Sequence, residues 1–386
     1  MDISYIINEL GEERDRYQGA VSPPIFQTSN FCAPTVADMR EALSKEMDAP
    51  FYTRGHNPTV AILRKKLAAL EGYEEALVFG SGSAAIAAAV VSQVKAGYHV
   101  ICVQKPYSWT YKLLTKLLAR FGVEATFIEG KDPEEWQGAV QANTRVFMLE
   151  SPNSMTFELQ DLKAVSAIAR EKGIVTILDN SYCTPLNQRA ADFGIDIVTH
   201  SASKYLNGHS DIVAGALCTS REIAKQIFEG EYMTLGGILS PNDAWLMMRG
   251  LRTLPVRLVR VAETAPKVVA FLEGHPKVDR VLYPWATSFP QRELADRQMA
   301  QPGGMFSIEL KADDIAACER FANALQRFLL ACSWGGHESL VFPICTLYDS
   351  QNYSETSLPW NFFRFYTGLE DAEVLIADLE RALELV

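Results

Sequence analysis

The sequence predicts an α/β fold, with a mostly parallel sheet covered by helices and a smaller α+β domain at the C-terminal end. From about Lys66 onward, short apolar runs alternate with patterns typical of helices. These runs are continuous instead of alternating with polar residues, which is typical of parallel strands buried on both faces. From Arg221 the pattern becomes mainly helical, and this change indicates a domain boundary near Pro255.

Seven apolar runs predict the strands of the first sheet. In chain order they are "ALVF" (76–79), "HVICVQ" (99–104), "ATFIEG" (125–130), "RVFMLE" (145–150), "IVTILD" (174–179), "DIVTHS" (196–201) and "IVAGALCTS" (212–220). Helical patterns between them include residues 107–121 and residues 162–172, and Gly173 closes the second at a C-cap position.

The C-terminal part begins with a long helical segment over residues 243–274, which we expect to be interrupted or kinked at Pro255. The strands "MFSIEL" (305–310) and "FFRFYTG" (362–368) follow, and "DAEVLIADLERALELV" (371–386) predicts the last helix. With a length of 386 residues, this pattern predicts an N-terminal arm over residues 1–55, a main domain over 56–255 and a C-terminal domain over 256–386.

Composition excludes several classes of protein. The formal net charge is −11 without a clustered basic face, which argues against a nucleic-acid partner. The opening "MDISYIINELGEERDR" has no basic run ahead of an apolar core, so we expect no secretory signal and a cytoplasmic location. The uncharged stretch 76–94 approaches the length of a membrane span, but its small residues and internal turn favour a buried strand and helix over a membrane partner.

Cysteine and histidine spacing gives no sign of a metal site. The seven cysteines are scattered and mostly flanked by apolar residues, which predicts reduced thiols in the core. No H-x-x-x-H or C-x-x-C spacing occurs, so we expect no protein-bound metal.

The stretch "LVFGSGSAAIAAA" (77–89) predicts a phosphate site, because a strand feeds a glycine-rich loop that opens a helix. Gly80, Gly82 and Ala85 also spell the dinucleotide pattern G-x-G-x-x-A. That pattern requires an acidic residue after the next strand, where this chain has Gln104 and Lys105. These two residues argue against NAD. A non-catalytic or nucleotide-binding role, in which the glycine-rich loop holds NAD, is the alternative from a different class.

Two further residues that could bind a cofactor lie at or after predicted strand ends. Asp179 ends the run "IVTILD", and Lys204 lies in "HSASKY" after the next run. A lysine for a Schiff base, an aspartate for a protonated pyridine nitrogen and a phosphate loop are together what pyridoxal 5'-phosphate needs. The sequence therefore predicts pyridoxal phosphate as the cofactor.

The chain resembles the Cys/Met-metabolism family of pyridoxal-phosphate enzymes, the transsulfuration enzymes. Eight blocks occur in the family's order over nearly the whole chain: "GAVSPPIFQTSNF", "YTRGHNPT", "FGSGSAAI", "ESPNS", "LDNSYCTP", "SASKYLNGHSD", "SWGGHESL" and "FFRFYTGLED". The resemblance implies the fold type I pyridoxal-phosphate transferase architecture and a sulfur-containing amino acid as substrate.

The resemblance also implies roles at the cofactor. Lys204 would hold pyridoxal phosphate and then move protons, and Asp179 would keep the ring nitrogen protonated. Tyr107 would stack on the ring and take part in proton transfer. The phosphate would be bound by Gly82, Ser83, Ser201 and Ser203, and by Tyr52 and Arg54 of a neighbouring subunit. The implied assembly is a homotetramer, a dimer of dimers with shared active sites.

The resemblance further implies that Arg364 binds the substrate α-carboxylate, a bidentate task suited to a guanidinium group. Ser333 and Trp334 would add contacts to that carboxylate, and Ser154 would also contact the substrate. Ser154 and Trp334 resemble the bacterial cystathionine β-lyase branch, whereas "YTRGHNPT" resembles the γ-acting branch, and Cys332 and Ser83 match neither pattern.

Two reactions therefore remain open. The first is α,β-elimination of L-cystathionine or a related cysteine conjugate to pyruvate, ammonia and homocysteine, a step of methionine biosynthesis. The alternative is a γ-acting relative: cystathionine γ-synthase, cystathionine or methionine γ-lyase, or a homoserine sulfhydrylase.

Overall fold

The chain forms two compact units. The computed structural model describes residues 1–348, 350 and 357–386. The N-terminal unit comprises Met1–Ser151, Gln160–Asn207 and Asp211–Thr253, and the C-terminal unit comprises Pro152–Leu159, Gly208–Ser210 and Leu254–Val386.

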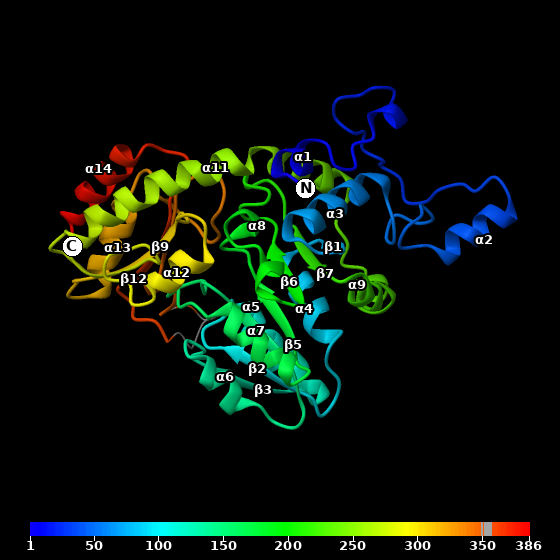
Figure 1. Cartoon of the computed structure of the whole chain (residues 1–386). Helices are drawn as coiled ribbons and strands as arrows, with labels where there is room; N and C mark the ends of the chain where they lie inside the picture. The colour runs from blue at the N-terminus through cyan, green and yellow to red at the C-terminus, as the bar shows by residue number, and fades with distance from the viewer. Residues whose placement is uncertain (349, 351–356) are drawn as a thin grey trace. The chain divides into compact units, whose positions relative to one another are not determined.

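A seven-stranded sheet forms the core of the N-terminal unit (Figure 1). Its order is β1 (Glu75–Phe79), β7 (Gly215–Thr219), β6 (Ile197–Ser201), β5 (Val175–Asp179), β4 (Thr144–Glu150), β2 (His99–Val103) and β3 (Glu124–Ile128). Neighbouring strands are parallel except that β7 runs antiparallel to both β1 and β6. All seven predicted runs form strands, and the mostly parallel sheet is confirmed.

Helices surround this sheet in the sequence order that the periodicity predicts. α7 (Leu162–Glu171) begins at the N-cap Asp161 and ends before Gly173, which adopts the predicted left-handed conformation with φ 64°. The predicted helix over residues 107–121 forms as α5 (Ser108–Lys112), the π-helical turn η2 (Leu113–Leu117) and the 3-10 turn η3 (Leu118–Phe121). The other helices of the unit are α1 (Ile3–Asn8), η1 (Arg14–Tyr17), α2 (Val36–Ser44), α3 (Pro58–Glu71), α4 (Gly82–Val91), α6 (Pro133–Ala139), α8 (Thr184–Asn187), η4 (Ala190–Phe193), α9 (Arg221–Ile227), η5 (Phe228–Tyr232) and α10 (Met233–Leu235).

The N-terminal arm is anchored at one point and exposed at another. Lys66 is fully buried, donates from Nζ to the carbonyl oxygens of Ile6 and Ile7 at 3.0 and 2.8 Å, and pairs with Glu12 at 3.0 Å. This buried pair holds α1 against α3. By contrast, α2 has no buried residue.

The C-terminal unit is an α+β structure around a five-stranded sheet. Its order is β10 (Leu329–Leu330), β11 (Leu340–Pro343), β12 (Phe362–Tyr366), β9 (Met305–Leu310) and β8 (Val278–Leu282). β10 pairs with β11 in parallel, and the other pairs are antiparallel. The helices are α12 (Arg292–Gln298), α13 (Ile315–Ala324), η6 (Ile344–Leu347) and α14 (Ala372–Leu383).

Of the interruption or kink expected at Pro255, the interruption is not found. One helix, α11 (Pro241–Glu273), starts in the N-terminal unit, continues through Pro255 and Pro266, and ends in the C-terminal unit. A proline inside a helix costs about 3 kcal/mol. Burial of one apolar face offsets that cost, because a row of side chains at helical spacing is fully buried: Leu251, Leu254, Leu258, Val261, Ala265 and Val268.

Five of the seven cysteines are buried free thiols as expected, whereas Cys32 and Cys332 are exposed free thiols. In the part of the chain that the structure describes, no group of three or more His, Cys, Asp or Glu side chains could hold a metal ion. Within the same described ranges, no helix has both the length and the apolar character that crossing a membrane requires.

Candidate active site

The loop after β1 ends at the N-terminus of α4. Ser81 caps this ten-residue helix, because its Oγ accepts a hydrogen bond from Ala84 N at 3.1 Å. The carbonyl oxygen of Ser81 accepts from Ala85 N at 3.2 Å. Among the described contacts, the N–H groups of Gly82 and Ser83 therefore remain for an anion at the positive end of the helix dipole.

Glycine at position 82 allows this loop to pack on the end of β6. A Cβ atom added to Gly82 would lie 2.7 Å from Ser201 Cα and 2.9 Å from Ser201 Oγ. A Cβ atom on Gly215, at the start of β7, would lie 2.0 Å from Ser81 O. Any larger residue would push the loop away from the strands. The structure thus brings the Ser201 hydroxyl next to the predicted phosphate loop.

Asp179 lies at the end of β5, beside Thr199 of β6, and is almost completely buried. Its Oδ1 accepts hydrogen bonds from Ser181 N at 3.0 Å and from Ser181 Oγ at 2.5 Å. Burial raises the pKa of Asp179, while the Ser181 bonds and the charges of His200 and Lys204 oppose that rise. A desolvated carboxylate of this kind favours a cationic partner such as a protonated pyridine nitrogen.

Ser181 also connects Asp179 to the end of β6, which lies beside the predicted phosphate loop. Its Oγ accepts a hydrogen bond from Ser201 N at 2.6 Å. Ser181 was not among the residues predicted from the sequence, although its position two residues after Asp179 is the spacing at which a serine bonds back to an aspartate.

Lys204 follows β6 in a tight turn, where its backbone N donates to Ser201 O at 3.0 Å. Ser203 holds this turn to residue 214, because its Oγ donates to Ala214 O at 3.2 Å and accepts from Ala214 N at 2.9 Å. A hydroxyl has one hydrogen. Ser203 could therefore donate to a phosphate only after releasing Ala214 O, and its phosphate role stays a prediction.

Tyr107 begins α5 and is anchored by its backbone, which donates to Glu150 Oε2 at 2.6 Å. Tyr52 and Arg54 lie before α3 with exposed side chains, and the Arg54 guanidinium lies 5.5 Å from the centre of the Tyr52 ring. Their expected contact with a neighbouring subunit's phosphate stays a prediction.

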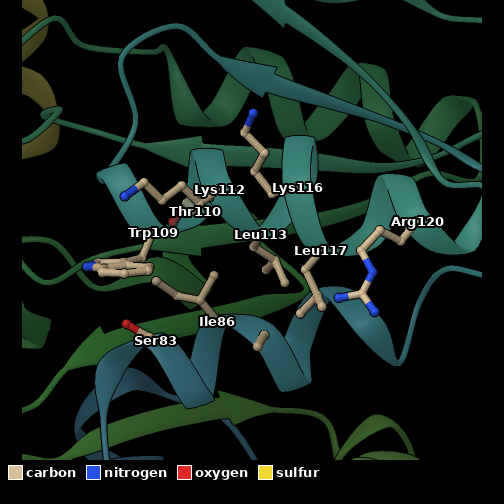
Figure 2. Close-up of a pocket in the computed structure, with 10 residues that line it drawn as sticks. Ser83, Ile86, Trp109, Thr110, Lys112, Leu113, Lys116, Leu117 and Arg120 are labelled. Carbon is tan, nitrogen blue, oxygen red and sulfur yellow. The ribbon is translucent and has the colours of Figure 1, made fainter. Parts of the chain in front are cut away.

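A surface hollow of about 490 Å³ adjoins Ser83. Figure 2 shows Leu113 and Leu117 pointing toward α4, which contributes Ile86. Three cationic side chains at helical spacing also line the hollow: Lys112, Lys116 and Arg120. The result is an apolar surface edged with positive charge next to the phosphate loop.

The predicted carboxylate-binding residues Arg364, Ser333, Trp334 and Ser154 all belong to the C-terminal unit. Arg364 of β12 donates from Nη2 to Ser333 O at 3.4 Å, and its Nη1 lies 3.6 Å from Met155 Sδ. Met155 follows Ser154 directly, and its carbonyl oxygen accepts from Ser307 Oγ at 2.8 Å on the neighbouring strand β9. Ser333 has a strained φ of 87°. Sequence reasoning missed Met155, because no local pattern links it to a residue 209 positions later.

The residues of the N-terminal unit fit pyridoxal phosphate. A helix N-terminus is available for the phosphate, a buried carboxylate for the ring nitrogen, and Lys204 lies in the turn beside Ser201. The structure thus places the predicted cofactor residues Gly82, Asp179, Ser201 and Lys204 around adjacent strand ends.

Comparisons with known proteins agree with this fit. A family model described as "Cys/Met metabolism PLP-dependent enzyme" matches residues 5–384. The chain is 40% identical over 372 residues to L-methionine gamma-lyase of Pseudomonas deceptionensis, covering 95% of this chain and 93% of that protein. It is 36% identical over 375 residues to cystathionine gamma-lyase of Bacillus subtilis strain 168, covering 96% of each. The crystal structure of metB from Corynebacterium glutamicum is similar with a TM-score of 0.92 and 32% identity, covering 100% of this chain and 98% of that one.

Proposed function

Because the chain belongs to the Cys/Met metabolism PLP-dependent enzyme family, we propose that it is a γ-acting carbon-sulfur lyase. The predicted family, the fold type and pyridoxal phosphate as cofactor are confirmed. The similarity to two γ-lyases over at least 95% of the chain carries the proposal. It favours the γ-acting alternative over the β-elimination that was the first hypothesis.

Trp334 and Ser154, which favoured a β-lyase in the sequence, do not identify the reaction. Trp334 is only 8% exposed, so its identity reflects packing as much as substrate choice. Ser154 lies in a loop whose shape Asn153 sets, because the Asn153 Oδ1 accepts from the backbone N of Met155, Thr156 and Phe157. Neither observation requires cleavage at Cβ.

L-methionine is the proposed substrate, with L-cystathionine as the second candidate. The first is named for the Pseudomonas relative and the second for the Bacillus relative. Cleavage of the Cγ–S bond of either would give 2-oxobutyrate and ammonia, with methanethiol from methionine or cysteine from cystathionine. A cytoplasmic location and a role in transsulfuration or methionine biosynthesis stay predictions.

Three side chains of this chain would move or hold protons in the proposed reaction. The chemistry that pyridoxal phosphate would supply when bound is an electron sink, which makes the proton on the substrate Cα acidic. Lys204 Nζ takes that proton, and a γ-elimination also requires removal of a proton from Cβ. The Asp179 carboxylate would keep a proton on the ring nitrogen of the bound cofactor, and the Tyr107 hydroxyl would give a proton to the departing sulfur.

Arg364 would orient the substrate by its α-carboxylate. Ser333 contacts Arg364, while Trp334 follows Ser333 and Ser154 precedes Met155, the other residue that Arg364 contacts. The Arg364 guanidinium is positioned from two sides, by Ser333 O and by the Phe342 ring 5.7 Å away. A guanidinium held in this way loses little freedom when it binds a carboxylate.

The proposed assembly is a dimer of dimers in which residues 1–55 reach a second copy of the chain. Val36, Met39 and Leu43 form an apolar face on α2, and each is more than half exposed. We assign this face to the hollow beside Ser83 on the second copy. Residues 35–48 carry four acidic and two basic side chains, which complements the three cations around the hollow.

Met39→Asp should then reduce the mass of the assembly in solution, whereas Arg280→Asp on the C-terminal unit should not. An unchanged mass of the assembly for both variants would contradict this interface.

Analysis of the keto acid tests the proposed reaction. The protein loaded with pyridoxal phosphate is incubated with L-methionine and, separately, with L-cystathionine, and the products are identified by mass spectrometry. We expect 2-oxobutyrate from both, with Lys204→Ala as the inactive control. Pyruvate as the dominant product from cystathionine would restore β-elimination and overturn the proposal.

A further inference from the structure

Glu71, the last residue of α3, is buried and uses both of its carboxylate oxygens. Oε1 accepts from Asn180 Nδ2 at 3.0 Å and lies 2.6 Å from His200 Nε2. Oε2 accepts from Ala190 N at 3.0 Å. Glu71, Asn180 and His200 are each at most 1% exposed, so this Glu71 cluster excludes water.

The partners of Glu71 are the chain neighbours of two candidate site residues. Asn180 follows Asp179 directly, and His200 precedes Ser201 directly. Successive side chains of a strand point to opposite faces of the sheet. His200 and Ser201 therefore face opposite ways, and Glu71 binds β6 from the face that Ser201 does not use.

The same cluster ties β5 to β6 at their ends. Asn180 N donates to Thr199 O at 2.9 Å, which continues the hydrogen bonds between β5 and β6 by one residue beyond Asp179. Among the described residues, the buried Nδ1 of His200 has no hydrogen-bond partner, so the Glu71 contact is the polar anchor of this ring. A charged acceptor makes stronger hydrogen bonds than a neutral one, and Glu71 thus fixes both strand ends through one group.

We propose that Glu71 is a positioning residue that holds Asp179 and Ser201 in the geometry that binds pyridoxal phosphate, which rests on the proposed roles of those two residues. Ser181 links Asp179 and Ser201 at the site itself. Glu71 fixes their chain neighbours through Asn180 and His200. Small shifts of either group would weaken the cofactor's contacts without unfolding the sheet.

Glu71→Gln tests this role, because glutamine keeps the shape but has one acceptor oxygen and no charge. Glu12→Gln is the matched control, since Glu12 is equally buried but pairs with Lys66 and Arg252 at the N-terminal arm. Two quantities are measured for each variant: the dissociation constant of pyridoxal phosphate, by absorbance titration of the cofactor-free protein, and the melting temperature without cofactor.

We expect Glu71→Gln to raise the dissociation constant about tenfold or more, as for loss of a group that orients a ligand's contacts. Glu12→Gln should lower the melting temperature and leave that constant within about twofold. In the loaded enzyme, Glu71→Gln should lower kcat with little change in KM, because Arg364 is untouched. Equal cofactor affinity in Glu71→Gln and wild type, or an equal loss in both variants, would overturn the inference.

A second variant covers the case in which Glu71→Gln does not fold. His200→Ala removes one of the three partners, and we expect a smaller rise of the same constant, about threefold to tenfold. An unchanged constant in His200→Ala would likewise count against the Glu71 cluster. If the wild type itself failed to bind pyridoxal phosphate, the proposed function would fail, and this result is separate from a failure confined to the variants.

Discussion

Ser181 donates two hydrogen bonds to one oxygen of Asp179, from its backbone N at 3.0 Å and from its Oγ at 2.5 Å. The same Oγ accepts from Ser201 N at 2.6 Å, so one hydroxyl connects the buried carboxylate to the strand end beside the phosphate loop. These bonds favour the ionised form of a carboxyl group whose burial favours the neutral form. Substitution of Ser181 should therefore change the pKa of Asp179.

Ser181→Ala should weaken binding of pyridoxal phosphate. The variant removes the Oγ bond, so the pKa of Asp179 should rise further and less of the carboxylate should be ionised. Loss of a hydrogen bond to a charged group costs about 1.5–3 kcal/mol. Equilibrium titration with the cofactor measures this loss. Ser166→Ala is the control, because the Ser166 hydroxyl on α7 donates to Phe193 O and not to Asp179. Equal cofactor affinities in the two variants would refute the role of Ser181.

Asp179→Asn should change how stability of the cofactor-free protein depends on pH. Burial raises the pKa of Asp179 above its unfolded value of about 3.9, so the folded state binds this proton more strongly. The unfolding free energy of the wild type should then fall, relative to the variant, as pH rises from about 4 through the folded-state pKa, and remain lower above it. Denaturant titrations of both proteins across this range provide the measurement, and a difference independent of pH would contradict the assignment.

Lys204→Ala should keep the fold and lose turnover by roughly 10²- to 10⁴-fold or more, because one amine both anchors the cofactor and moves protons. Circular dichroism checks the fold, and a coupled keto-acid assay checks the rate. In the wild type, borohydride reduction and peptide mapping should place the cofactor label on Lys204. A label on any other lysine would disprove this assignment.

Arg364→Ala should lower kcat/KM by a factor that corresponds to a loss of about 2–4 kcal/mol of transition-state stabilisation, as for removal of one partner from a desolvated charge pair. Arg364→Lys should recover only part of this loss, since an ammonium group cannot bind a carboxylate in the same two-pronged way. Steady-state kinetics with L-methionine measure both variants. Arg280→Ala serves as the control because Arg280 is exposed on β8 and pairs with Glu309; a loss of the same size there would show that Arg364 has no special role.

Mixing Arg54→Ala with Lys204→Ala should restore part of the activity that each variant lacks alone. If Arg54 binds the phosphate of a neighbouring subunit, a hybrid contains one site with both native residues. The recovery is measured after subunit exchange has been verified by native mass spectrometry. Absence of recovery in verified hybrids would argue that each chain builds its site alone.

Local patterns account for most of the sheet and for the cofactor residues. Seven apolar runs each form a strand, and those inside the sheet are apolar because both of their faces are buried, whereas the edge strand β3 is only partly buried. β8 escapes this signal, since Asp279 and Arg280 lie exposed between Val278 and Val281. The break expected at Pro255 is absent because the buried face of α11 outweighs a local preference. Asp179 and Lys204 could be identified because each follows a recognisable strand and parallel strands end at one edge.

Contacts between distant segments arise only in the folded chain. Arg364 meets Met155 because β12 pairs with β9, whose Ser307 binds the Met155 carbonyl. Glu71 meets His200, 129 positions away, because α3 packs on β1 and β7 and its last residue reaches the neighbouring strand β6. The sequence by itself determined the strands of the seven-stranded sheet, the glycine-rich loop and the residue types at the strand ends, since these depend on neighbours along the chain. The tertiary structure alone decided the partners that orient them, because sheet register and helix packing depend on the whole core.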